Sequence, residues 1–478
     1  KLSSSKKVSS RIDWSPTSVD LTALTAYQKT RKMFNIRFLF VCAIAFMACN
    51  QGKKLPDQVT YEAHIKPLLQ THCNYCHYKN SGHLPLTSFA DAKRFSSSIK
   101  YVVDQSIMPP WPADPHYSSF LNQRVLDEYD KQLITKWIKD GLKEGDKSAL
   151  NEVENIANPF NLEKPDLVLA VTPTFIKQHA NDQFLVVKVP FELPDETYVS
   201  VIEFVPGKHQ VVHHVNGDLV KYEDAKKKNV FGGVYSLPIT HDSTIKQVFE
   251  KMDLPNDDGT YPILQKSVVN YLPGVYAQIY KNGIGGYLLP KKGCFLLNDL
   301  HYGTSKTAIW DSSYIRIYFA KTPPKRPLQE FQLGTLGVAP VLPNLLIFPN
   351  TVKKVHSQYI IPNDISLVTI NPHMHLLGKS FKAYAVIPKG DTIPLIHIPN
   401  WDFNWQYFYT FRKLLKIPKG SLMIAEGVYD NTTKNLLNPF TPPQLISDNK
   451  GSMKTTDEMF QFIVSYVPYK DGDENIDL

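Results

Sequence analysis

The stretch Phe381-Lys382-Ala383-Tyr384-Ala385-Val386-Ile387 has an apolar residue at every second position. This alternation is typical of a β-strand with one face against a core, because successive side chains of a strand point to opposite faces. Further short apolar or alternating runs occupy residues 167–171, 184–189, 198–205 and 315–319, and Pro, Gly and Asn separate them. The chain from residue 166 onward is therefore predicted to be all β.

The length of this β region indicates more than one domain. It spans roughly 310 residues, which exceeds an ordinary β-sandwich of about 100. We predict two tandem antiparallel β-sandwiches, jelly-roll-like, over residues 166–325 and 326–478, with a boundary near the Pro-rich stretch 323–340. Residues 147–165 lack periodicity and contain Asn151, Asn155, Asn158 and Pro159, so they are interpreted as a linker.

A different pattern precedes the linker: Cys73-Asn74-Tyr75-Cys76-His77. C-x-x-C-H is the pattern of covalent haem attachment, with thioethers at Cys73 and Cys76 and His77 as an iron ligand. A thioredoxin-like redox pair and half of a zinc site are the competing interpretations, although no second Cys pair is present for zinc. Residues 61–72 are predicted to form the helix that leads into this motif.

Met108 is the candidate for the second axial haem ligand. It lies in Ser106-Ile107-Met108-Pro109-Pro110-Trp111, where two prolines stiffen the loop and exclude a helix. The alternative is a buried methionine that fills a gap in a core. A closing helix is predicted from an N-cap at Asp127 to a stop at Gly141. Residues 55–146 thus resemble a small all-α cytochrome c domain, whose His and Met ligation favours electron relay.

The net charge of +8 does not indicate a nucleic-acid partner. Residues 1–48 hold eight Lys or Arg against two Asp, so they carry +6 of the charge and leave +2 for the rest. No basic stripe therefore runs over the body of the chain, and we predict no nucleic-acid binding.

The basic excess is typical of a leader. Arg31, Lys32 and Arg37 precede the apolar run 38–48, which predicts a secretory signal peptide with translation starting at Met33. The following Cys49 resembles a bacterial lipobox cysteine. We therefore expect an exported, periplasmic protein that a lipid at Cys49 anchors to the membrane.

Histidines gather at three places in the β region. His213 and His214 lie on an expected strand, where adjacent side chains point to opposite faces, so joint ligation of one metal requires a bulge or a strand end there. His373 and His375 have the i, i+2 spacing that places two imidazoles on one face. His301 stands alone. Each place by itself is more often a solvated polar face or a satisfied core pair than a metal site.

The three places together resemble the copper type II, ascorbate-dependent monooxygenases, which include peptidylglycine α-hydroxylating monooxygenase and dopamine β-hydroxylase. The resemblance covers residues 165–470. It rests on four motifs: His213-His214-Val215, Leu300-His301-Tyr302-Gly303, Pro372-His373-Met374-His375-Leu376-Leu377-Gly378-Lys379 and Thr455-Thr456-Asp457-Glu458-Met459.

The resemblance implies two copper ions. His213, His214 and His301 would hold one that transfers electrons, and a second group would hold the one where O₂ and substrate react. That catalytic group is His373, His375 and Met459. A soft thioether favours copper(I) over zinc. The alternative for Met459 is a methionine that only fills the core. Met453 is a nearby rival for the ligand position.

The expected function is hydroxylation of a C–H bond in an unknown small-molecule or peptide substrate. Electrons would come from ascorbate, or from a redox partner through the covalently attached c-type haem. The main alternative is an exported electron-transfer or copper-binding lipoprotein without hydroxylase activity. A zinc-dependent hydrolase is a weaker third alternative, since no H-E-x-x-H occurs.

Overall fold

The computed structural model describes residues 53–74, 76–79, 83–121, 123–147, 164–179, 183–238, 245–272, 277, 279–280, 283–448 and 456–478. The predicted signal peptide, Cys49, Met453 and most of the predicted linker 147–165 lie outside these ranges. The helices and strands named below belong to one compact unit, residues 58–478. Within the described ranges, no helix combines the length and apolar character that crossing a membrane requires.

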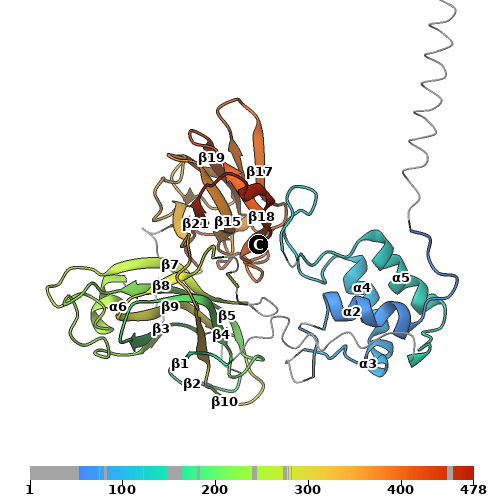
Figure 1. Cartoon of the computed structure of the whole chain (residues 1–478). Helices are drawn as coiled ribbons and strands as arrows, with labels where there is room; N and C mark the ends of the chain where they lie inside the picture. Colours follow the sequence, from blue (N-terminus) through green and yellow to red (C-terminus); the bar gives the residue numbers. More distant parts are fainter. Residues whose placement is uncertain are drawn as a thin grey trace, which may run out of the picture. The chain divides into compact units, whose positions relative to one another are not determined.

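The part before residue 147 is helical (Figure 1). Its elements are η1 (Tyr61–Ile65), α2 (Lys66–His72), α3 (Phe89–Arg94), α4 (Ser96–Asp104) and α5 (Glu128–Lys139). The predicted helix over 61–72 is confirmed, with a first turn of π-helix. Asp127 caps α5 by accepting a hydrogen bond from the Asp130 N–H at 2.8 Å, as predicted. Tyr61 and Trp137 pack with ring centroids 6.2 Å apart and so join η1 to α5.

The strands of the first β part form two main antiparallel sheets, which Figure 1 draws in green and yellow. One sheet has the order β6-β3-β9-β5-β7 and the other β1-β11-β4-β8, and β10 pairs with β2. Helix α6 (Ile245–Lys251) precedes β7. The strands are β1 (Leu167–Ala170), β2 (Thr174–Ile176), β3 (Gln183–Glu192), β4 (Thr197–Val205), β5 (Val212–Lys221), β6 (Ser236–Pro238), β7 (Ile263–Tyr271), β8 (Tyr287–Leu289), β9 (Lys292–Tyr302), β10 (Ile309–Asp311) and β11 (Tyr314–Phe319).

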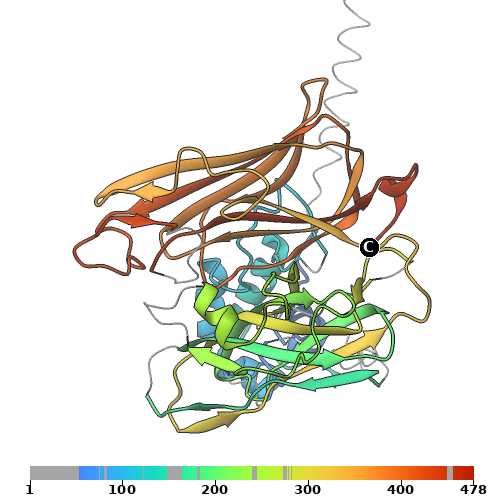
Figure 2. The same cartoon turned by 90° about the vertical axis from the view of Figure 1, so that its left-hand side faces the viewer.

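The second β part is built in the same way, and its long strands, coloured orange to red, run along one another in Figure 2. Its sheets have the orders β12-β21-β15-β18 and β14-β19-β16-β17, and β13 pairs with β20. Its elements are β12 (Gln329–Gly334), β13 (Leu346–Ile347), β14 (Thr351–Ile360), β15 (Ile365–Met374), β16 (Gly378–Val386), β17 (Thr392–Ile398), β18 (Tyr409–Ile417), β19 (Leu422–Asn431), β20 (Ile446–Ser447), β21 (Phe460–Pro468) and η3 (Asp473–Asn475).

Apolar side chains fill the space between the sheets of each part. Phe204 and Ile317 from one sheet meet Leu219 and Phe295 from the other in the first part. A second cluster, which includes Phe381, fills the other part. The β-sandwich prediction is thereby confirmed. Strand β11 ends before the Pro-rich stretch 323–340 and β12 begins within it, while the exact domain bounds stay a prediction.

Candidate functional site: two histidine clusters at one cavity

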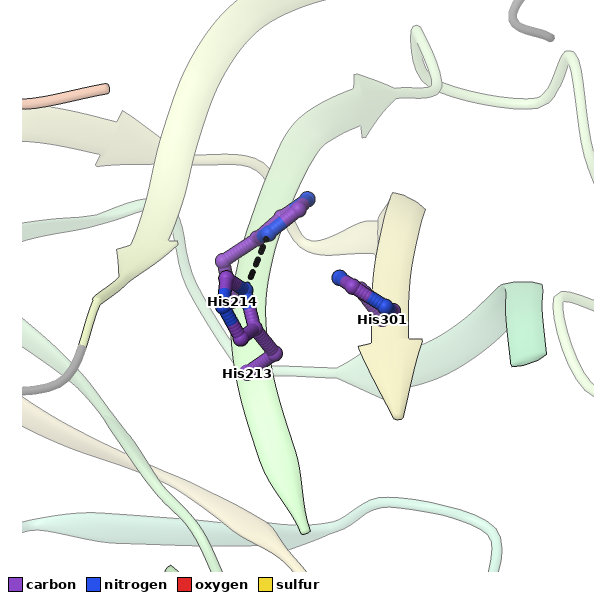
Figure 3. A group of neighbouring side chains, drawn as sticks. All are labelled: His213, His214 and His301. Carbon is purple, nitrogen blue, oxygen red and sulfur yellow. Dashed lines mark hydrogen bonds between the residues drawn. The ribbon is translucent and has the colours of Figure 1, made fainter. Parts of the chain in front are cut away.

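The first histidine cluster lies where β5 and β9 run side by side. Val212 pairs with Tyr302 and His214 pairs with His301, so His213 is the extra residue of a β-bulge. The bulge removes the usual alternation and allows both neighbouring imidazoles to approach His301. Their ligand atoms all lie within 4.8 Å of one another. Figure 3 shows the three side chains on these two neighbouring strands.

The spacing of the ring nitrogens suits one metal ion. The Nδ1 atoms of His213 and His214 are 3.1 Å apart, and tetrahedral ligands at about 2.0 Å from an ion are about 3.3 Å from each other. The other nitrogen of His214, Nε2, donates to the Asp299 carboxylate at 2.8 Å. Burial alone would raise the pKa of Asp299, but the neighbouring His214 lowers it to about 2. This carboxylate therefore orients His214 with Nδ1 toward the cluster.

The second cluster forms where β15 ends. Met374 points into the core, and His373 and His375 on either side of it have ring centroids 5.0 Å apart. His373 Nδ1 donates to Gln406 Oε1, and the Gln406 amide nitrogen donates to the Phe403 carbonyl at 2.8 Å, which fixes the orientation of the amide. Burial, followed by the nearby His375, lowers the pKa of His373 to about 3. The imidazole is thus neutral, as metal ligation requires.

Glu458 holds the turn that carries His375. Its carboxylate is 1% exposed and accepts from the backbone N–H groups of His375 at 3.0 Å, Leu377 at 2.6 Å and Met459 at 3.3 Å. Burial raises its pKa to about 8, although these three donors act in the opposite direction. His375 Nδ1 also donates to the Asp457 carbonyl at 3.0 Å. The segment of the predicted ligand Met459 therefore lies against His375.

Both clusters border one cavity of about 150 Å³. His214 and Asp299 line it from the first sandwich, and His373 and His375 line it from the second. The Phe403 ring lies edge-on to His214 at 6.0 Å and to His375 at 5.9 Å, so one side chain contacts both clusters. A cavity of this size accommodates a group as large as a benzene ring.

The C-x-x-C-H motif follows directly after α2. The His77 N–H donates to the Cys73 carbonyl at 3.0 Å and the Cys76 N–H to the same oxygen at 3.1 Å, which folds the motif into a tight turn. Both thiols are free. Burial raises the pKa of Cys73 to about 12 and also raises that of Cys76, whereas a thioredoxin-like pair requires a lowered thiol pKa.

The surroundings of the motif also disfavour zinc. His213, His214 and His301 form the one group of at least three closely spaced His, Cys, Asp or Glu ligands in the described part of the chain, so no zinc set surrounds Cys73 and Cys76. His77 Nδ1 bonds to the Leu84 carbonyl at 2.9 Å. Met108 is half-buried in the loop after α4, with its N–H bonded to the Val102 carbonyl at 3.1 Å.

The sequence analysis assigned no role to four side chains that support the site: Asp299, Phe403, Gln406 and Glu458. Asp299 carried a usable signal, because it lies two positions before His301 on the same strand. Gln406 contacts His373 across 33 residues of chain and Glu458 contacts His375 across 83, and Phe403 is likewise distant in sequence from both clusters. No local pattern predicts such contacts.

Comparison with known proteins gives a family match over the part of the chain that contains the second histidine cluster. Residues 350–471 match the family model of the copper type II ascorbate-dependent monooxygenase, C-terminal domain. No curated protein matches the chain. Among solved structures, that of infectious bursal disease virus Gx strain aligns at 8% identity and a TM-score of 0.15, over 66% of this chain and 79% of the viral one. This last similarity is too low to indicate fold or function. The matched residues contain His373, His375 and Met459, and this similarity supports a copper monooxygenase, an oxidoreductase.

Proposed function

We propose that this enzyme hydroxylates a C–H bond of an organic substrate at the cavity between the two histidine clusters. One atom of O₂ would enter the C–H bond and the other would leave as water, with two electrons from ascorbate or an equivalent reductant and two protons. The observation that carries the proposal is that His214 and His373, from different sandwiches, line the same cavity. The two proposed metal sites would then both border the cavity that receives the substrate.

The donor set fits copper. His213, His214 and His301 would hold one ion and His373, His375 and Met459 the other, since imidazoles suit both oxidation states of copper and a thioether favours copper(I). When bound, copper would supply one-electron redox chemistry and the activation of O₂. The protein's own part is to keep His373 neutral, to orient His214 through Asp299, and to hold the His375 turn through Glu458.

The residues of the helical part fit a c-type haem. Cys73 and Cys76 would form the thioethers, and His77 and Met108 would be the axial ligands. The bond from His77 Nδ1 to the Leu84 carbonyl supports this assignment, because metal-ligating histidines generally engage their other ring nitrogen in this way. When bound, the haem would supply one-electron transfer from a redox partner.

The same proposal includes an exported, periplasmic location with a lipid anchor at Cys49. A small molecule or a peptide would be the substrate. The raised thiol pKa values and the lack of a surrounding zinc set among the described residues favour haem over the redox-pair and zinc interpretations of Cys73 and Cys76.

The first test is a count of metals per chain. Protein produced with haem-maturation machinery and equilibrated with copper should contain one iron and two coppers. His375→Ala should lose one copper, whereas His356→Ala, a change in β14 outside both clusters, should keep both. Absence of tightly held copper in the unchanged protein would remove the monooxygenase proposal.

A second measurement distinguishes hydroxylation from simple electron transfer. Substrate-stimulated O₂ uptake should disappear in Met459→Ala if the second site performs the chemistry. Uptake that is insensitive to this change, in protein with both coppers bound, would favour an electron-transfer lipoprotein without hydroxylase activity.

A further inference from the structure

The loop that carries Met108 is bonded to the second sandwich. Tyr407 donates a hydrogen bond from its hydroxyl to the Pro110 carbonyl at 2.9 Å, and Pro110 lies two residues after Met108. The Tyr407 ring is 3% exposed and contacts Trp111 at 5.6 Å between centroids. Trp111 also meets Tyr409 edge-on at 5.4 Å. The loop is thus attached to the sandwich by a partly buried hydrogen bond and two ring contacts.

Gln406, the residue before Tyr407, links the Met108 loop to His373. Gln406 accepts the Nδ1 hydrogen bond of His373 and is itself anchored to the Phe403 carbonyl. Two hydrogen bonds and one stretch of covalent chain, from Tyr407 to Gln406, therefore join the Met108 loop to a proposed copper ligand. An electron on this path would cross no solvent gap, because Tyr407 belongs to the core of the second sandwich and Trp111 packs against that core.

We infer that Tyr407 and Gln406 form the route by which an electron passes from the haem to the ion held by His373. The inference rests on the proposed function, since it needs both groups. Bound haem would donate one electron, so that its ferrous iron would become ferric, and copper bound at His373 would accept it and change from cupric to cuprous. No covalent bond forms or breaks. The haem would then supply electrons directly to the proposed oxygen-binding copper site. The electrons would not pass through the ion held by His213, His214 and His301.

A second contact offers the alternative route. Tyr78, next to His77, meets the His209 ring edge-on at 6.2 Å, and the Tyr271 hydroxyl lies 3.4 Å from His209 Nδ1. This path leads into the first sandwich, where β7 pairs with β5. Its hydrogen bond is near the upper limit of length, whereas the bond from Tyr407 has the ordinary 2.9 Å. The geometry therefore favours the route through Tyr407.

The test measures electron transfer within the haem- and copper-loaded protein. After rapid photoreduction of the haem, its reoxidation by copper is followed by absorbance. Tyr407→Phe keeps the ring and removes the hydroxyl, so we expect a several-fold slower reoxidation with an unchanged haem spectrum and haem midpoint potential. Tyr271→Phe is the matched control, since it removes the hydroxyl on the alternative route, and its rate should equal that of the unchanged protein.

A second variant checks the other hydrogen bond. Gln406→Met preserves length but cannot accept from His373, so it should slow the same step and alter the paramagnetic resonance spectrum of the copper held there. An unchanged rate in both Tyr407→Phe and Gln406→Met, or a slower rate in Tyr271→Phe alone, would overturn the inferred route. If copper does not speed haem reoxidation even in the unchanged protein, the haem relay of the proposed function fails as well.

Discussion

The Glu458 carboxylate accepts a hydrogen bond from the backbone N–H of His375 at 3.0 Å, across 83 residues of sequence. A buried carboxylate thus fixes the main chain of a proposed copper ligand, and through Leu377 and Met459 it fixes the residues on both sides of the site. The arrangement couples the position of His375 to that of Met459.

Replacement of Glu458 should therefore reduce both stability and copper binding. Glu458→Ala leaves three buried N–H groups without an acceptor, and each such loss costs about 1–3 kcal/mol. We expect a fall of about 3 kcal/mol or more in the free energy of unfolding of the metal-free protein, measured by urea denaturation. Glu426→Ala, at an exposed position of β19, should change it by about 0.5 kcal/mol or less. Equal effects of the two changes would contradict the role of Glu458.

Asp299 should control copper affinity at the first cluster alone. Its carboxylate holds His214 through Nε2 at 2.8 Å, and loss of such a partner typically weakens metal binding by about 10–100-fold. In a copper titration Asp299→Asn should show one weakened site and one unchanged site. Asp258→Asn, at an exposed loop position, is the control. Two unchanged sites would show that Asp299 does not support the ligand.

Gly378 provides a test of packing beside the second cluster. A Cβ atom there would lie 2.5 Å from Trp401 Cδ1 and 3.1 Å from the His375 carbonyl oxygen, so one of these neighbours must move. We expect Gly378→Ala to cost about 1–3 kcal/mol of stability. Gly303→Ala, where the nearest atom is 3.9 Å away, should be well tolerated. Thermal unfolding of both variants measures the difference, and a neutral Gly378→Ala would show that the Trp401 ring yields freely.

The sequence alone predicted much of the fold, because strand periodicity and helix caps are local. The alternation over 381–387 corresponds to β16, and the runs over 184–189 and 198–205 lie within β3 and β4. An irregularity at His213-His214, a bulge or a strand end, was also predictable, since adjacent strand residues otherwise face apart, and the structure has the bulge.

The supporting residues of the site were less predictable. Gln406 reaches His373 across 33 residues and Glu458 reaches His375 across 83. Their roles depend on which strands pair and on the path of a loop, and neither is encoded by a short motif. The π-helical first turn of the helix over 61–72 was likewise not visible in its apolar spacing.

The two motif cysteines should decide whether haem is attached. In a denaturing gel stained for haem peroxidase activity, the unchanged protein should keep its haem, and a variant with both Cys73→Ala and Cys76→Ala should lose it, because two thioethers would then be missing. Cys294→Ala is the matched control, since this thiol is buried in a separate apolar cluster. Haem staining that persists in the double variant would contradict covalent attachment at the motif.

The raised pKa of Glu330 predicts how the stability of the protein depends on pH. One of its carboxyl oxygens, Oε1, is buried and has no hydrogen-bond partner among the described residues. Burial, followed by the nearby Asp218, raises its pKa from 4.5 to about 8. Between these values the folded protein holds a proton that the unfolded chain releases, so stability should fall as pH rises from about 4.5 to about 8 and this contribution should then level off. Urea midpoints measured across this range, for the unchanged protein and for Glu330→Gln, isolate the effect because all other titrating groups are common to both. The variant should lose part of the slope, and identical slopes would show that Glu330 titrates normally in the folded protein.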